Sequence, residues 1–264
     1  MHKYWLYFRL SLIRTFTYRG QLLIFTLATV VSVIPLIAVW LSLGNISAGG
    51  YSQHELITYY IVGLFIQRII YSSLINYYVQ EIVSDGSIVG LFLTKPVSFF
   101  WATFGLQAGW LAVSLVLGAT VTTAFALIIG TGIVVHLTLG TALFFLSAVM
   151  LGMLLVFVTS LLLGLLSFWT VHISSFVSLY WMALFLFGGI TLPLTFFPDK
   201  IEKVLSFNPF RFVFSFPLEI LLGKISSPEL LSGYITTLVW IGLSVAGYKL
   251  IWRLGNKAYT GYGQ

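Results

Sequence analysis

Long apolar stretches almost free of ionisable side chains fill most of this 264-residue chain and restrict its fold more than any other feature. Residues 22–43, for example, contain no Asp, Glu, Lys, Arg or His. At about 1.5 Å per residue, a helix of that length crosses a hydrocarbon layer of about 30 Å. With 8% charged residues and a mean hydropathy of +1.03, the chain is not expected to stay in solution as a globule. The sequence therefore predicts an all-α integral membrane protein.

Six apolar segments are long enough to be transmembrane helices. We place the spans at about residues 22–43, 56–79, 99–128, 137–169, 175–194 and 230–251. Little of the chain remains for a water-soluble module, so residues 1–264 are expected to form a single transmembrane domain.

The segment before the first span has the pattern of an amphipathic helix. Over residues 2–19, Trp5, Phe8, Leu12 and Phe16 recur at helical spacing. We expect an N-terminal interfacial helix lying in the membrane surface, with a polar lead-in to the first span as the alternative.

Lys and Arg are distributed unevenly between the two sides that six spans would define. Eight lie in the N-terminal segment, the loop 80–98 and the C-terminal end. Because cytoplasmic loops retain positive charge, both termini are predicted to be cytoplasmic. These basic residues lie beside spans and not along one polar face, which argues against nucleic acid as a partner.

The segment 195–229 on the opposite side is rich in proline and also apolar. Five prolines lie in it or just before it: Pro193, Pro198, Pro209, Pro217 and Pro228. They exclude one continuous helix, yet the many Phe and Leu residues favour burial. We expect an external re-entrant helical hairpin before the last span, and a loose external loop is the alternative.

Side chains that could carry out catalysis are scarce. The seven acidic residues fall in loops or near span ends, the four histidines are far apart, and cysteine is absent. We therefore expect neither an enzyme nor an ion-coupled carrier, both of which need polar groups held at membrane depth. Two alternatives remain: a channel or gradient-driven carrier, and a lipid-modifying enzyme that would depend on His136 or His172.

Gln67 and Arg68 are the exception within a span. A lone guanidinium near the middle of a transmembrane helix costs at least about 2.5 kcal/mol on insertion scales. The two residues could line a translocation pathway or a subunit interface. Alternatively, the helix is shifted along its axis and Arg68 reaches the headgroups.

Small residues at a spacing of four mark close helix contacts. Gly105 and Gly109 form a G-x-x-x-G pair, and Ser160 and Gly164 have the same spacing. We interpret both pairs as sites of packing within the chain.

The polar segment 81–96 alternates charged and apolar side chains and ends at Pro96. Such a segment can form a short amphipathic helix that docks apolar side chains into a partner's groove. The simpler interpretation is a turn between two helices.

Taken in order, these elements resemble a membrane subunit of a bacterial ATP-binding-cassette exporter of the type-2 permease superfamily. The resemblance covers nearly the whole chain. It rests on the basic N-terminal helix, the Asp85-Gly86-Ser87 turn followed by Leu-x-Leu-x-Lys95-Pro96, the Gly188-Gly189-x-x-x-Pro193-x-x-x-x-Pro198 stretch and the tail 253–264.

The resemblance implies a permease that holds no cofactor itself. In that family the loop between spans two and three contacts a pair of cytoplasmic ATP-binding subunits, which carry ATP and Mg. Here that contact would fall at Glu81, Asp85, Gly86 and Leu91, and the proline-rich hairpin would close the outer end of the pathway.

The resemblance also implies a second permease subunit, of the same or a different chain, and a bacterial cytoplasmic (inner) membrane location. Drugs, lipids and glycolipids are substrates of such exporters, and nothing in the sequence selects among them.

Overall fold

The computed structural model describes residues 2–43, 47–130, 133–170 and 172–259, and no β-strand occurs in these ranges. The α-helices are α1 (His2–Thr17), α2 (Arg19–Ser42), α3 (Gln53–Ser72), α4 (Asn76–Ser84), α5 (Phe99–Ile129), α6 (Leu139–Leu165), α7 (Ser174–Phe187), α8 (Asp199–Leu205), α9 (Ser215–Leu221) and α10 (Ser227–Ala258). Four short non-α turns of helix connect them: η1 (Val89–Leu93), η2 (Leu166–Phe168), η3 (Leu194–Phe196) and η4 (Arg211–Val213).

Five helical stretches among the described residues are long and apolar enough to cross a membrane. They are Leu22–Ser42, Gln53–Ser84, Phe99–Ile129, Leu139–Phe168 and Ser227–Ala258. The all-α class with several membrane helices is thus confirmed. Helix α7 is also apolar but has 14 residues, and at about 1.5 Å per residue it is shorter than the hydrocarbon core.

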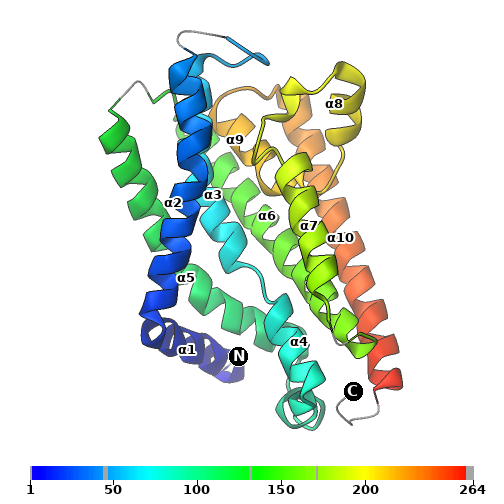
Figure 1. Cartoon of the computed structure of the whole chain (residues 1–264). Helices are drawn as coiled ribbons and strands as arrows, with labels where there is room; N and C mark the ends of the chain where they lie inside the picture. The colour runs from blue at the N-terminus through cyan, green and yellow to red at the C-terminus, as the bar shows by residue number, and fades with distance from the viewer. Residues whose placement is uncertain (1, 44–46, 131–132, 171, 260–264) are drawn as a thin grey trace.

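The bundle has two distinct ends (Figure 1). Helix α1 runs across the end where α4 and the C-terminal part of α10 also lie, and α2 rises away from it. At the opposite end, α8, α9 and the loops around them form a cap. The N-terminal helix and the chain's C-terminal helix therefore finish at the same end of the molecule.

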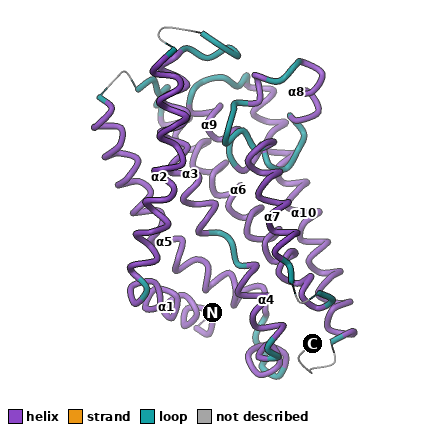
Figure 2. Tube along the Cα trace, viewed as in Figure 1, coloured by secondary structure: helices purple, strands orange, loops and turns teal. Residues whose placement is uncertain are grey.

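The predicted second span is interrupted. Helix α3 ends at Ser72 and α4 begins at Asn76, and Figure 2 shows the loop segment between them. The hydroxyls of Ser72 and Ser73 both donate to the Ile69 carbonyl, at 2.8 and 2.7 Å. Because such bonds compete with the helical ladder, they favour an end to α3 here. The Ile75 N–H donates instead to the Ser160 hydroxyl of α6, at 3.1 Å.

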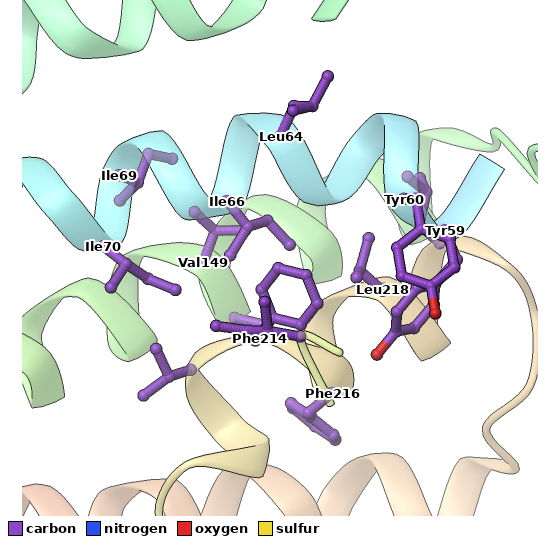
Figure 3. Packing of buried hydrophobic residues seen from close by; sticks show 14 of the residues in the cluster. Tyr59, Tyr60, Leu64, Ile66, Ile69, Ile70, Val149, Phe214, Phe216 and Leu218 are labelled. Carbon is purple, nitrogen blue, oxygen red and sulfur yellow. The ribbon is translucent and has the colours of Figure 1, made fainter. Parts of the chain in front are cut away.

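The core is built around α3. Of the most apolar window in Gln53–Ser84, 83% of the residues are buried, compared with 22% for α2. Figure 3 shows one side of this core, where Ile66 and Ile70 of α3 face Val149 of α6 and Phe214 of the cap. A second apolar cluster, around Phe92, Phe99 and Phe157, fills the end near α4. Helix α3 is thus enclosed by protein.

Glycines bring helices into contact, as the small-residue spacings predicted. A Cβ atom at Gly109 would lie 2.7 Å from the Phe8 carbonyl oxygen, and one at Gly105 would lie 3.0 Å from the Tyr4 oxygen. Both glycines of the G-x-x-x-G pair therefore seat α1 on α5. Gly164 likewise lies against Val79 of α4. The structure confirms these positions as packing sites within the chain.

Candidate functional site

The segment between α4 and α5 folds into a tight turn followed by a π-helical stretch. Gly86 has a φ of +78°, a conformation that side chains with a Cβ adopt poorly. The Ser87 N–H donates to the Asp85 carboxylate at 2.8 Å, and the hydrogen bonds from Ser87 lower the pKa of Asp85. An ionised Asp85 therefore stabilises the turn at neutral pH. The π-helix η1 follows and is closed by the Thr94 N–H donating to the Val89 carbonyl.

This segment divides its apolar side chains between the core and the surface. Ile88 is fully buried, and Phe92 lies edge-on to Phe99. Leu91 and Leu93 are 37% and 40% exposed. Ile88 and Phe92 therefore hold the segment against the rest of the chain, while Leu91 and Leu93 remain exposed.

The four residues predicted to couple to an ATPase lie close together in sequence but differ in setting. Asp85, Glu81 and Leu91 are exposed, and Gly86 is half-buried at the turn. Glu81 and Leu91 also line one cavity of about 650 Å³. The turn is braced from elsewhere in the chain, because the Tyr259 hydroxyl donates to the Val83 carbonyl at 3.0 Å.

Gln67 and Arg68 lie inside the bundle. Arg68 is 2% exposed and Gln67 3% exposed. The Arg68 Nε and Nη2 atoms and the Gln67 Oε1 atom have no hydrogen-bond partner among the described residues. The Arg68 guanidinium lies 5.9 Å from the Trp110 ring centroid, a cation–π contact that offsets only part of the cost of burying a charge.

Much of the proline-rich segment is packed into the bundle. Every residue from Phe212 to Leu222 is buried. The Ser215 N–H donates to the Gly188 carbonyl at 3.1 Å, and the Tyr59 hydroxyl donates to the Gly189 carbonyl at 2.7 Å. The ring of Phe214 fits where α3 has Gly63, since a Cβ there would lie 2.9 Å from the ring. These contacts pack the segment against α3 and against residues 188–189.

The predicted hairpin prolines fall into two groups. Pro193 and Pro217 are buried, whereas Pro209 is half-buried and Pro198 exposed. Pro193 and Pro198 precede η3 and α8, where the missing N–H costs nothing. Pro217 lies in the first turn of α9. Pro193, Pro198 and Pro217 therefore lie at the starts of helices.

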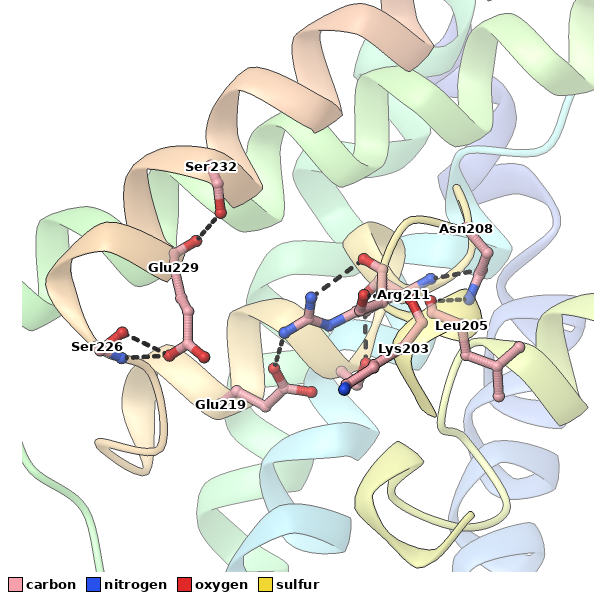
Figure 4. Close-up of polar contacts among 10 residues, drawn as sticks. Lys203, Leu205, Asn208, Arg211, Glu219, Ser226, Glu229 and Ser232 are labelled. Carbon is pink, nitrogen blue, oxygen red and sulfur yellow. Dashed lines mark hydrogen bonds and ion pairs between the residues drawn. The ribbon is translucent and has the colours of Figure 1, made fainter. Parts of the chain in front are cut away.

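Two ion pairs hold the cap. Arg211 Nη2 lies 2.7 Å from Glu219 Oε2, and Lys224 Nζ lies 2.7 Å from Glu55 Oε1. Figure 4 shows the first pair, together with the Asn208 side chain, which accepts a hydrogen bond from the Arg211 backbone N–H. Burial lowers the pKa of Arg211, but the nearby Glu219, with smaller contributions from Glu229 and Tyr51, raises it, and the net pKa lies above its usual value. Lys224 also donates to the Gly50 carbonyl at 3.0 Å.

A polar cavity of about 470 Å³ lies beside these pairs, lined by Arg211, Glu219 and Lys224 among others. Glu55, Glu219 and Lys224 are not among the site residues predicted from the sequence. Glu55 was recognisable as the fourth residue of a Ser52-x-x-Glu55 capping box. The ion-pair partners depend on tertiary contacts that no local pattern reveals.

Among the described residues, the histidines belong to no group that could bind a metal ion. In the described part of the chain, no group of three or more His, Cys, Asp or Glu side chains could hold a metal ion. His136 and His172 are exposed, and the His136 backbone N–H donates to the Leu221 carbonyl at 3.2 Å. The two residues lie in different loops, before α6 and before α7.

Comparison with known proteins assigns the class. A family model described as ABC-2 family transporter protein matches residues 25–263. The chain therefore belongs to the ABC-2 transporter family, which confirms the resemblance seen in the sequence. Its membrane subunits are generally non-enzymatic and belong to ABC transporters with ATPase partner subunits. Comparison with curated proteins gave no significant match.

Proposed function

We propose that this chain is a six-span permease subunit of an ATP-driven exporter. It moves an amphiphilic or hydrophobic substrate, such as a drug, lipid or glycolipid, across or out of a bacterial cytoplasmic membrane. Both termini are cytoplasmic. ATP and Mg are bound by a separate pair of ATPase subunits, and a second permease subunit, of the same or a different chain, completes the complex.

The observation that carries the proposal is the form of the segment between α4 and α5 in a chain of this family. It is fixed by its own buried Ile88 and Phe92 and exposes Asp85 and Leu91. This exposed segment joins α4 to α5. A movement of a bound partner can therefore be passed on to both helices. Glu81, Asp85, Gly86 and Leu91 are the residues we assign to the ATPase contact.

Helix α7 supplies the sixth crossing in this proposal. It lies along the bundle and leads toward the cap (Figure 1). Its 14 residues span only about 21 Å, and the segment up to the buried Pro193 extends the crossing. An even number of crossings agrees with both ends of the chain lying at one end of the bundle.

Arg68 and the hairpin both act on the transport pathway. Arg68 holds a buried charge without an anionic partner among the described residues, so it needs water or a substrate group when the bundle opens. The hairpin, with Pro193 and Pro217 buried at its base, closes the outer end of the pathway. Arg68→Ala is expected to slow transport, and an unchanged transport rate with intact assembly would contradict this role.

Transport by the reconstituted complex tests the function. Inverted membrane vesicles that contain the permease and its ATPase should accumulate a fluorescent amphiphile only with ATP. Uptake driven by an ion gradient without the ATPase would favour a channel or carrier. Formation of a modified lipid by the purified chain, lost in His136→Ala or His172→Ala, would favour an enzyme.

A further inference from the structure

The cavity between α1, α4 and α5 combines an apolar wall with an arginine and a glutamate that form no ion pair among the described residues. Its volume of about 650 Å³ lies within the range of roughly 300–1,000 Å³ that is typical of small-molecule pockets. It lies where α1 crosses the end of the bundle and α3 gives way to α4.

Helix α1 contributes one face to this cavity. Tyr7, Leu10, Ser11 and Arg14 line it, at the spacing that places residues on one side of a helix. Other apolar side chains of α1 project outward, including Ile13 and Phe16, which are 60% and 66% exposed. A helix with this exposed apolar surface fits the boundary between headgroups and acyl chains.

The polar groups of the cavity are not paired with one another. The ion pairs in the described ranges are Arg211–Glu219 and Lys224–Glu55, so Arg14 and Glu81, which both line the cavity, have no ion-pair partner there. Asn76 also lines it and is 1% exposed, and its Nδ2 atom lacks a hydrogen-bond partner among the described residues.

The opposite wall is apolar and extends toward the middle of the bundle. Leu74, Leu106 and Trp110 lie in it. Leu106 is the eighth residue of α5, about 10 Å along the helix axis from its start. The cavity therefore extends from the charged side chains of Arg14 and Glu81 to a depth at which lipid acyl chains begin.

We propose that this cavity binds one phospholipid from the adjacent leaflet. The phosphate lies at Arg14, a hydrogen-bond donor of the headgroup lies at Glu81, and the first carbons of the acyl chains lie against Leu106 and Trp110. Both ammonium and hydroxyl headgroups supply such a donor, whereas a choline headgroup does not. Because Leu91 of the α4–α5 segment also lines the cavity, the bound lipid touches the segment that we assign to the ATPase contact.

Native mass spectrometry of the purified chain with added lipid tests the site without any ATPase, so its outcome is independent of the transport proposal. Phosphatidylethanolamine and phosphatidylglycerol should each bind more tightly than phosphatidylcholine. Arg14→Gln should weaken the binding of all three about tenfold, since a hydrogen bond to a charged group is worth at least that much. Glu81→Gln should remove the preference over phosphatidylcholine.

Arg9→Gln is the matched control, because Arg9 is an exposed residue of the same helix and does not line the cavity. It should bind lipid like the wild type. Leu106→Trp fills the cavity without changing charge and should weaken binding even if Arg14→Gln does not fold. Equal binding of all three lipids by the wild type, or equal loss in Arg9→Gln and Arg14→Gln, would overturn the proposal.

Discussion

At the scale of single residues, the buried charges divide into paired and unpaired groups. Arg211 and Glu219 neutralise each other at 2.7 Å with side chains that are 19% and 8% exposed. Arg68 has no such partner among the described residues and faces an aromatic ring. A buried pair tolerates its environment only while both members are present. The pair therefore belongs to the architecture of the cap, and the unpaired arginine is the better candidate for function.

Breaking the cap's ion pair should destabilise the protein strongly. Glu219→Gln leaves the Arg211 charge without its partner and is expected to cost about 3–5 kcal/mol. Thermal unfolding of the purified protein in detergent measures this cost. Glu202 lines the same cavity but forms no ion pair among the described residues, so Glu202→Gln should leave the melting temperature nearly unchanged. Equal melting temperatures for the two variants would contradict the assigned role of the pair.

At the scale of helices, contacts between distant segments decide where elements end. Five apolar spans and a helix at the N-terminus follow from local composition and periodicity. The predicted span 175–194 contains only the 14-residue helix α7, and a sixth crossing stays a proposal. The break between α3 and α4 depends on Ser160, which lies 85 positions from Ile75. The insertion of Phe214 depends on the gap left by Gly63. Neither contact has a signature in its own stretch of sequence, so neither could be predicted.

The seating of α1 on α5 depends on the absence of a side chain at Gly109. Gly109→Leu is expected to displace α1, because its Cβ alone would lie 2.7 Å from the Phe8 carbonyl oxygen. Limited trypsin digestion should then cleave faster at Arg9 and Arg14. Gly242→Leu is the control, since nothing lies within 4 Å of a Cβ there. Unchanged cleavage in Gly109→Leu would show that α1 is held by other contacts.

At the scale of the whole molecule, the two ends of the bundle are built from different structural elements. One end holds α1, the α4–α5 segment and the end of α10, and the other holds the ion-paired cap (Figure 1). We propose that the ATPase acts at the first end and that substrate is released at the second. The composition of the chain predicted a membrane protein, and the family resemblance implied an ATP-binding partner subunit. The cavity that joins α1 to the α4–α5 segment became visible only in three dimensions.

The orientation of these ends can be tested cleanly because the chain contains no cysteine. Lys203→Cys in the cap and Thr94→Cys beside α5 are both exposed positions. A membrane-impermeant maleimide added to intact cells should label Lys203→Cys and should label Thr94→Cys only after permeabilisation. Labelling of both variants from outside would contradict the odd number of crossings that the six-span proposal places between Thr94 and Lys203.

Co-purification shows whether the α4–α5 segment docks an ATPase. The tagged chain is extracted in mild detergent, and its partners are identified for the wild type, Asp85→Lys and Leu91→Asp. Phe207→Asp, at an exposed position of the cap, is the control. We expect an ATP-binding subunit with the wild type and with Phe207→Asp, and its loss from the other two while they remain folded. Retention of the subunit by both Asp85→Lys and Leu91→Asp, or no ATP-binding partner for the wild type, would contradict the account.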